Sequence, residues 1–188
     1  INTERIEVAK GPSSTLYGGG VGSALGGLIN VVTKSPTADR KTIVGLRGGS
    51  HKTFGGFLDL NLANPTSGKF RFRLTGEVES SDTAIEAVDS DRQSFHPSLG
   101  ITLGNRTELS IRGQYSDNRY REYSGLPADL VLSSSFRGDP FQFSGAPDAP
   151  RNSVENRLLT ATLDHRFSAD VEASITARHY ESEFDEIG

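Results

Sequence analysis

The chain has 188 residues, enough for one domain or for part of a larger one. It carries 20 lysine and arginine against 24 aspartate and glutamate residues, a formal net charge of -4 without the basic excess typical of nucleic-acid-binding proteins. Only 34% of the residues are hydrophobic, and no apolar run approaches the roughly eighteen residues of a membrane-spanning helix, which excludes a helical membrane protein. The lack of cysteine excludes disulfide frameworks, thiolate catalysis and zinc fingers.

The two ends of the sequence suggest that it continues beyond them. It starts at Ile1 without an initiator methionine or a leader, and it stops at Gly188 directly after a strand-like segment. We therefore expect an internal fragment of a longer chain.

Residues 1–36 differ from the rest of the chain in composition and in the pattern of apolar residues. Two apolar segments rich in β-branched residues, Arg5–Val8 and Leu28–Val32, are typical of short strands. Between them lies a glycine-rich tract, in which Ser13 and Ser14 are candidate caps for a helical turn through Leu16–Tyr17. We expect a compact unit of strand, turn, loop and strand.

After a linker at 35–39, apolar and polar side chains alternate along the chain. In residues 69–78, for example, Phe70, Phe72 and Leu74 share one face, whereas charged side chains occupy the other. The same period of two recurs in further segments: 42–49, 53–62, 98–104, 108–115, 158–167 and 171–178. The pattern predicts about seven strands.

The connections between these strands alternate in length. After a first short turn, the expected order is short, long, tight, very long and tight: 63–68, 79–94, 104–106, 121–153 and 168–170. Long connections therefore fall at one end of the sheet and short ones at the other. This asymmetry is typical of an outer-membrane β-barrel, with short periplasmic turns and long extracellular loops.

Aromatic residues and charges agree with that interpretation. Phe70 and Phe167 fall at the short-turn rim of the apolar face, whereas Phe54, Phe95 and Tyr115 fall toward its long-loop rim, as in the aromatic girdles of lipid-facing barrels. The opposite face is charged through the following residues: Arg71, Arg73, Glu77, Glu108, Arg112, Gln114, Asp164, Arg166, Glu172 and Arg178. So many charges do not fit the core of a soluble sandwich. They fit a hydrated lumen, or one lined against a polar plug.

The residues from Glu4 to Gly18 and from Gly26 to Lys34 carry a specific motif. It reads ERIEVAKGPSSTLYG in the first stretch and GGLINVVTK in the second. It closely resembles the C-terminal half of the plug of TonB-dependent receptors. The subtype looks most similar to receptors for ferric siderophores, although cobalamin, haem and glycan receptors share the plug.

The resemblance implies a mainly β fold. Residues 1–36 would be the C-terminal part of a small α+β plug, and residues 37–188 the first, incomplete part of an antiparallel transmembrane β-barrel. Such a barrel has roughly 22 strands around a plugged lumen. The resemblance places the protein in the bacterial outer membrane, in contact with its lipid.

The resemblance also implies energy-coupled uptake of a scarce ligand, most simply a ferric siderophore, without catalysis. The TonB complex would act through a plug segment that lies before Ile1. No cofactor is implied, because iron enters only as part of the transported chelate.

The very long connection is the first candidate ligand site. Its candidate residues are Tyr120, Tyr123, Phe136, Arg137, Phe141 and Phe143. Long loops in compact proteins are usually functional, and aromatic rings with an arginine suit a bulky, anionic iron chelate. The alternative is that the rings pack the loop on itself.

Arg5 and Glu7 are a second candidate site. Their spacing places both on one side of a strand, from which they are expected to pair with wall charges such as Arg71, Glu77 or Arg112 and to lock the plug. The alternative is an ordinary solvated strand face.

Other functions have less support in the sequence. The glycines at 18–22 lack the lysine and the strand-loop-helix setting of a phosphate-binding loop. The four histidines are scattered without metal-ligand spacing, and no catalytic set stands out. A passive porin-like barrel and a soluble β-rich binding domain remain as alternatives from other classes.

Overall fold

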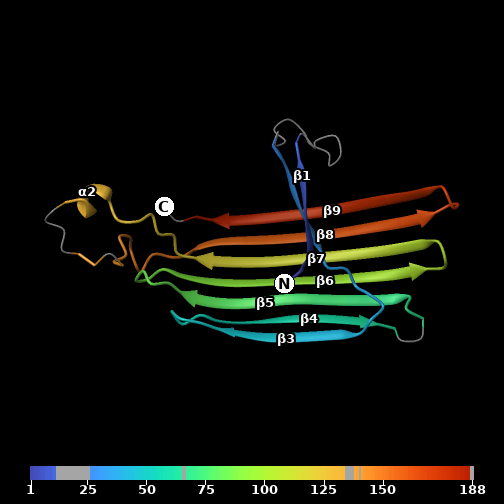
Figure 1. Cartoon of the computed structure of the whole chain (residues 1–188), viewed down its shortest axis with the longest axis horizontal. Coiled ribbons are helices and arrows are strands. Elements are labelled where there is room, and N and C mark those ends of the chain that lie inside the picture. Colours follow the sequence, from blue (N-terminus) through green and yellow to red (C-terminus); the bar gives the residue numbers. More distant parts are fainter. Residues whose placement is uncertain (12–25, 65–66, 134–137, 140, 187–188) are drawn as a thin grey trace. The chain divides into compact units, whose positions relative to one another are not determined.

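The computed structural model describes residues 1–11, 26–64, 67–133, 138–139 and 141–186 (Figure 1). It contains two compact units, Ile1–Ser35 and Pro36–Gly188. Within the described ranges, no helix combines the length and the apolar character needed to cross a membrane.

The first unit is a two-stranded antiparallel sheet. Strand β1 (Thr3–Lys10) pairs with β2 (Gly27–Thr33), so that Ile6 lies opposite Val31. Both strands were expected from their β-branched residues. The expected helical turn and most of the glycine-rich tract lie outside the described residues.

The second unit contains an antiparallel sheet of seven strands, each hydrogen-bonded to its neighbours in the sequence (Figure 1). The strands are β3 (Lys41–Gly48), β4 (Phe54–Ala63), β5 (Phe70–Asp82), β6 (Asp89–Leu103), β7 (Thr107–Tyr120), β8 (Asn152–Arg166) and β9 (Glu172–Asp185). A short helix, α2 (Ala128–Val131), lies between β7 and β8. The predicted fold, an antiparallel barrel segment of about seven strands, is confirmed.

The long acidic loop predicted at 79–94 is wrong. Strand β5 continues to Asp82 and β6 begins at Asp89, so that the connection covers only residues 83–88. Glu79 pairs with Arg92 in the ladder, and their side chains form an ion pair of 2.6 Å. Here the strands carry polar residues on both faces, so the apolar alternation that marks the rest of each strand disappears while the pairing continues.

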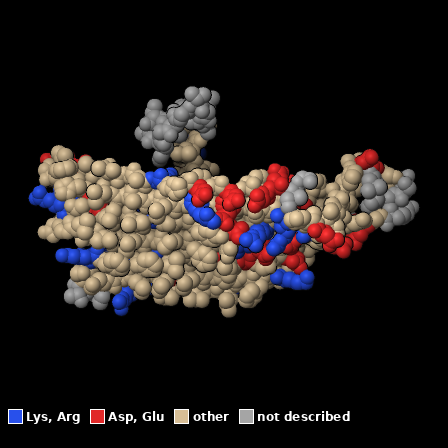
Figure 2. All heavy atoms as spheres, turned by 180° about the vertical axis from the view of Figure 1, so that it is seen from behind, with Lys and Arg blue, Asp and Glu red and all other residues tan. Residues whose placement is uncertain are grey.

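The register gives the sheet an apolar face and a polar face. Across the sheet, Val44, Leu58, Gly76, Phe95 and Tyr115 lie in one row of the apolar face. The exposed large hydrophobic residues on that face include Leu46, Phe54, Leu62, Phe70, Val78, Leu103, Leu159, Leu163 and Ile175. In Figure 2 a broad expanse without charged side chains covers part of the sheet; acidic and basic side chains gather between it and one end, and basic side chains also lie at the other end.

The polar face contains the most buried side chains of the sheet. Asp59, Asn61 and Thr75 are 3%, 2% and 1% exposed, whereas Ala63 is the sole buried hydrophobic residue among those described. This distribution is the reverse of a soluble domain, in which apolar side chains fill the core. It is the distribution expected of a sheet that turns its apolar face to lipid.

Candidate functional site

The loops of the sheet differ between its two ends (Figure 1). The β5–β6 connection and the long β7–β8 connection leave from the same end, which we call the loop end, and the turns after β4, β6 and β8 lie at the other. The predicted alternation of long and short connections is therefore present only in part: the β7–β8 connection is long, but the β5–β6 connection (83–88) is no longer than the one after β4 (64–69).

Ion pairs hold the base of the long loop against β6. The guanidinium of Arg151 donates to Asp89 at 2.5 Å and to Asp91 at 2.6 Å, and the backbone N–H of Arg121 donates to the carbonyl of Asp89 at 3.1 Å. The hydrogen bond to Asp91, reinforced by Asp89, holds the pKa of Arg151 above its ordinary value. Both ends of the loop thus leave the sheet at fixed points.

The structure brings some of the predicted ligand residues together. The rings of Tyr123 and Phe143 lie 6.1 Å apart at 33°, and the Tyr123 hydroxyl donates to the carbonyl of Gln142 at 3.3 Å. The ring of Phe141 stays exposed, while its carbonyl accepts a hydrogen bond from the backbone of Glu86 at 3.1 Å. The long loop is therefore packed partly on itself and partly on the β5–β6 loop.

The other predicted ligand residues lie elsewhere. Tyr120 is the last residue of β7, in a position on the polar face. Phe136 and Arg137 lie outside the described residues. Ligand binding by this loop stays a prediction.

Two ion pairs cross the polar face. Arg73 donates through Nε and Nη2 to both carboxylate oxygens of Asp59, each at 2.8 Å, a bidentate geometry that suits a guanidinium and a carboxylate. Arg71 reaches past Gly100 on the intervening strand to Glu108, at 2.6 Å. A side chain larger than hydrogen at Gly100 would lie against the Arg71 guanidinium.

A further group of charges lies at the loop end of this face. The carboxylate of Glu79 accepts hydrogen bonds from Arg47 on β3 and from Arg92 on β6. The register brings them into one row, with Gly55 between Arg47 and Glu79. The sequence analysis missed this group because only the strand register aligns residues so far apart in the chain.

Asn61 attaches the linker to the polar face. Its Oδ1 accepts the Thr37 N–H at 3.0 Å, and its Nδ2 donates to the Thr37 hydroxyl at 2.8 Å, to the Thr37 carbonyl at 3.2 Å and to the Asp39 carbonyl. The linker therefore follows a defined path along β4. No spacing signal in the sequence marks this asparagine.

Arg5 and Glu7 pair with each other in the first unit, at 2.8 Å. The amide of Asn30 donates to the other carboxylate oxygen of Glu7 at 2.9 Å. The hydrogen bond from Asn30, followed by that from Arg5, lowers the pKa of Glu7 from its ordinary value. The two units are described separately, so the predicted lock against the barrel wall stays a prediction.

No group of three or more histidine, aspartate or glutamate side chains among the described residues is arranged to hold a metal ion.

Comparison with known proteins identifies relatives of this fold. No family model matches the sequence. The chain is 32% identical over 177 residues to the metal-pseudopaline receptor CntO of Pseudomonas aeruginosa, which covers 94% of this chain and 24% of the relative. It is 25% identical over 168 residues to the ferrichrome outer membrane transporter/phage receptor of Escherichia coli K12, covering 88% of this chain and 22% of the relative.

This chain is homologous to TonB-dependent receptors of the bacterial outer membrane. It spans about a quarter of the length of the curated relatives that it matches. The crystal structure of the ferric-catecholate import receptor Fiu from E. coli K12, in its open form, superimposes with a TM-score of 0.84 at 25% identity, over 97% of this chain and 29% of that one. In a TonB-dependent receptor of the outer membrane, the exposed apolar face is the face that meets lipid.

Proposed function

We propose that the complete protein takes up a ferric siderophore across the outer membrane with energy supplied through the TonB complex. The observation that carries the proposal is the match of 94% of this chain to a metal-chelate receptor, on a sheet with one lipid-compatible face and one charged face. In this proposal residues 1–36 belong to the plug and residues 37–188 to the barrel. Cobalamin, haem or a glycan is the alternative ligand.

The long loop captures the chelate in this proposal. The rings of Tyr120, Tyr123, Phe141 and Phe143, with Phe136 and Arg137, offer stacking surfaces and a cation to an anionic, partly aromatic chelate. The base held by Arg151 limits the conformations open to the loop, so that less entropy is lost on binding. No covalent step and no resident cofactor is needed, because iron is carried within the substrate.

Plug displacement follows capture. The Arg5 and Glu7 pair lies on the strand that precedes the glycine-rich tract, where contacts with wall charges would hold the plug until the TonB complex pulls on it. In this proposal such contacts keep the plug in place at rest and break only when the TonB complex pulls on it.

Growth on defined iron chelates tests the function. The complete receptor, expressed in a strain without its own siderophore receptors, should restore growth on at least one ferric siderophore when TonB is present, and fail when TonB is deleted. Growth that persists without TonB would support a passive porin-like barrel instead. Rescue by cobalamin, haem or a glycan alone would replace the siderophore with that ligand.

Loop variants test the capture site. Tyr123→Ala and Phe141→Ala in the complete receptor should weaken chelate binding, because each removes a ring from the loop. Phe167→Ala, at the opposite end of the sheet, serves as the control. Equal affinity in all three variants would assign the loop rings to packing alone.

A further inference from the structure

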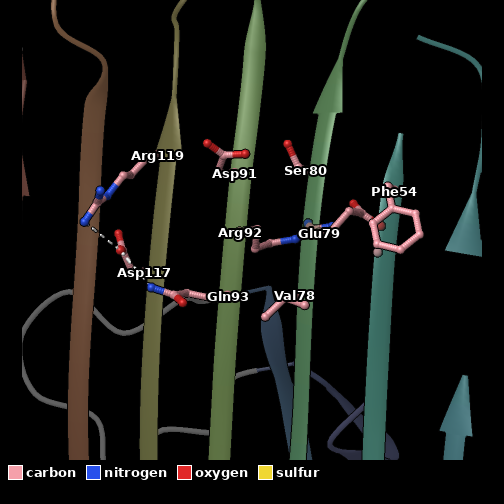
Figure 3. A pocket seen from close by; sticks show the side chains of 10 residues that line it. Phe54, Val78, Glu79, Ser80, Asp91, Arg92, Gln93, Asp117 and Arg119 are labelled. Carbon is pink, nitrogen blue, oxygen red and sulfur yellow. Dashed lines mark hydrogen bonds and ion pairs between the residues drawn. The ribbon is translucent and has the colours of Figure 1, made fainter. Parts of the chain in front are cut away.

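The hollow at the loop end of the sheet, about 350 Å³ in volume, holds polar side chains that bond to one another. The Gln93 amide donates to Asp117 at 3.2 Å, and Arg119 pairs with the same carboxylate at 3.2 Å (Figure 3). Asn61, near the opposite end of β4, differs from these residues. The four hydrogen bonds of its side chain go to the linker, although that side chain is only 2% exposed.

Two strands hold the linker on the polar face. Thr37 and Asp39 bond to Asn61 on β4. Pro36 lies over Gly100 on β6, where an added Cβ would be 3.5 Å from the Cγ atom of the proline. Glycine at this position therefore lets the proline ring lie close to the strand backbone. We call Asn61 and Gly100 the linker seat.

The linker seat sets how far the end of β2 can move from the barrel strands. β2 ends at Thr33, four residues before Thr37, and four extended residues span about 14 Å. Without the Asn61 hydrogen bonds, the next held residue is Arg40, whose Nε donates to the carbonyl of Ala63 at 3.2 Å. Seven residues then separate β2 from its anchor, and they span about 25 Å.

We propose that the linker seat limits the travel of the plug during uptake. This inference rests on the proposed function, in which the TonB complex pulls on the plug. The load passes along residues 1–36 and meets the linker seat first, so the last plug strand stays within about 14 Å of Thr37. The chelate gains a passage, and the plug remains close enough to close it again.

The surroundings of Asn61 suit this role. Because its amide is buried, water does not compete for the hydrogen bonds that it makes to the linker. The register places Asn61 opposite Arg73, which the bidentate pair with Asp59 fixes on the polar face. The wall behind the asparagine is therefore held by the sheet, and the linker side yields under load. Asn61 acts as a positioning residue, which holds the linker and takes no part in binding the chelate.

Optical tweezers test the linker seat on the complete receptor in a supported bilayer, with the pulling handle at the N-terminus of the complete chain. The measurement needs neither a chelate nor TonB, so its outcome is independent of the proposed function. At loads that leave the parent seat intact, Asn61→Ala should extend about 11 Å further than the parent, because three more residues are free.

Thr37→Pro tests the same contact from the exposed linker and leaves the barrel strands unchanged. Proline has no N–H to donate to Asn61 and no hydroxyl, so this variant should extend further as well. Two variants are matched controls. Thr37→Ser keeps the N–H and the hydroxyl, and Asn64→Ala removes an asparagine at the turn after the same strand. Both should extend as the parent does.

Vancomycin, a glycopeptide that an intact outer membrane excludes, measures plug travel in cells. In a medium whose ferric siderophore supports growth of the parent, Asn61→Ala should lower the inhibitory concentration of vancomycin when TonB is present and leave it unchanged when TonB is deleted. A barrel that is only destabilised would leak in both strains.

Three results would overturn the proposal: Asn61→Ala and Thr37→Pro extend as the parent does, vancomycin entry rises equally with and without TonB, or the variants extend further without any rise in vancomycin entry. If no ferric siderophore supports growth of the parent, the proposed function fails, and the tweezers measurement still decides whether the linker seat holds.

Discussion

Replacing Asn61 with alanine should free the linker from the sheet. Asn61 makes four hydrogen bonds to Thr37 and Asp39, and each is worth about 1 kcal/mol net. The linker residues themselves are exposed, so water can replace part of the hydrogen bonds that Thr37 and Asp39 lose when the Asn61 amide is removed. We therefore expect the free energy of local opening of the linker to fall by about 2 kcal/mol, rather than by the about 4 kcal/mol that four uncompensated hydrogen bonds would give.

Hydrogen exchange of the Thr37 amide measures this change directly. Its N–H is bonded to Asn61 Oδ1 at 3.0 Å, and a loss of about 2 kcal/mol corresponds to an exchange rate about 30-fold higher. The measurement uses the complete receptor and the peptide that contains Thr37. Asn61→Asp keeps an acceptor for this N–H but removes the three donated hydrogen bonds, so its effect on Thr37 should be smaller.

Asn64→Ala is the matched control, because Asn64 lies at the turn after the same strand and accepts from the backbone of Ser67 instead. Thr37 exchange should be unchanged in this control. If Asn61→Ala leaves Thr37 exchange within a factor of two of the parent, the side chain does not hold the linker and the reasoning fails.

Three further predictions concern charged groups. Asp59→Ala should destabilise the barrel by about 3 kcal/mol, because Arg73 loses its bidentate partner in a buried setting. The double variant Asp59→Ala with Arg73→Met should recover part of the thermal midpoint that the single variant loses. A double variant that recovers nothing would contradict this reasoning. Arg151→Ala should speed cleavage of the long loop in limited proteolysis of the complete receptor, and unchanged cleavage would show that the loop base is held by other contacts. Because the pKa of Glu7 is lowered, its contacts with Arg5 should persist at neutral pH and weaken only as the pH falls through that lowered value. In planar bilayers, Glu7→Gln should therefore raise the channel leak at neutral pH, and equal leak would refute the lock.

The strands could be predicted because the alternation of apolar and polar side chains can be read within a single segment of the sequence. In β5 the charged side chains at Arg71 and Arg73 fall on the face opposite Phe70 and Leu74, and a period of two reveals this without knowledge of any partner strand. The signal fails near the strand ends, where both faces are polar. The error at 79–94 has this cause.

The candidate sites depended more on the tertiary structure. The long loop was recognisable from its aromatic residues, but the contact between Tyr123 and Phe143 required its fold. The Glu79 group joins residues from three strands, and Asn61 joins β4 to the linker at Thr37.

By itself, the sequence determined that this protein is a sheet with one apolar and one charged face, and it marked the family through a motif at residues 4–34. Only the tertiary structure decided which charges meet. Alternation depends on the geometry of a single strand, whereas Arg71 reaches Glu108 only because the register of three strands places Gly100 between them. Register is set by pairing between distant parts of the chain.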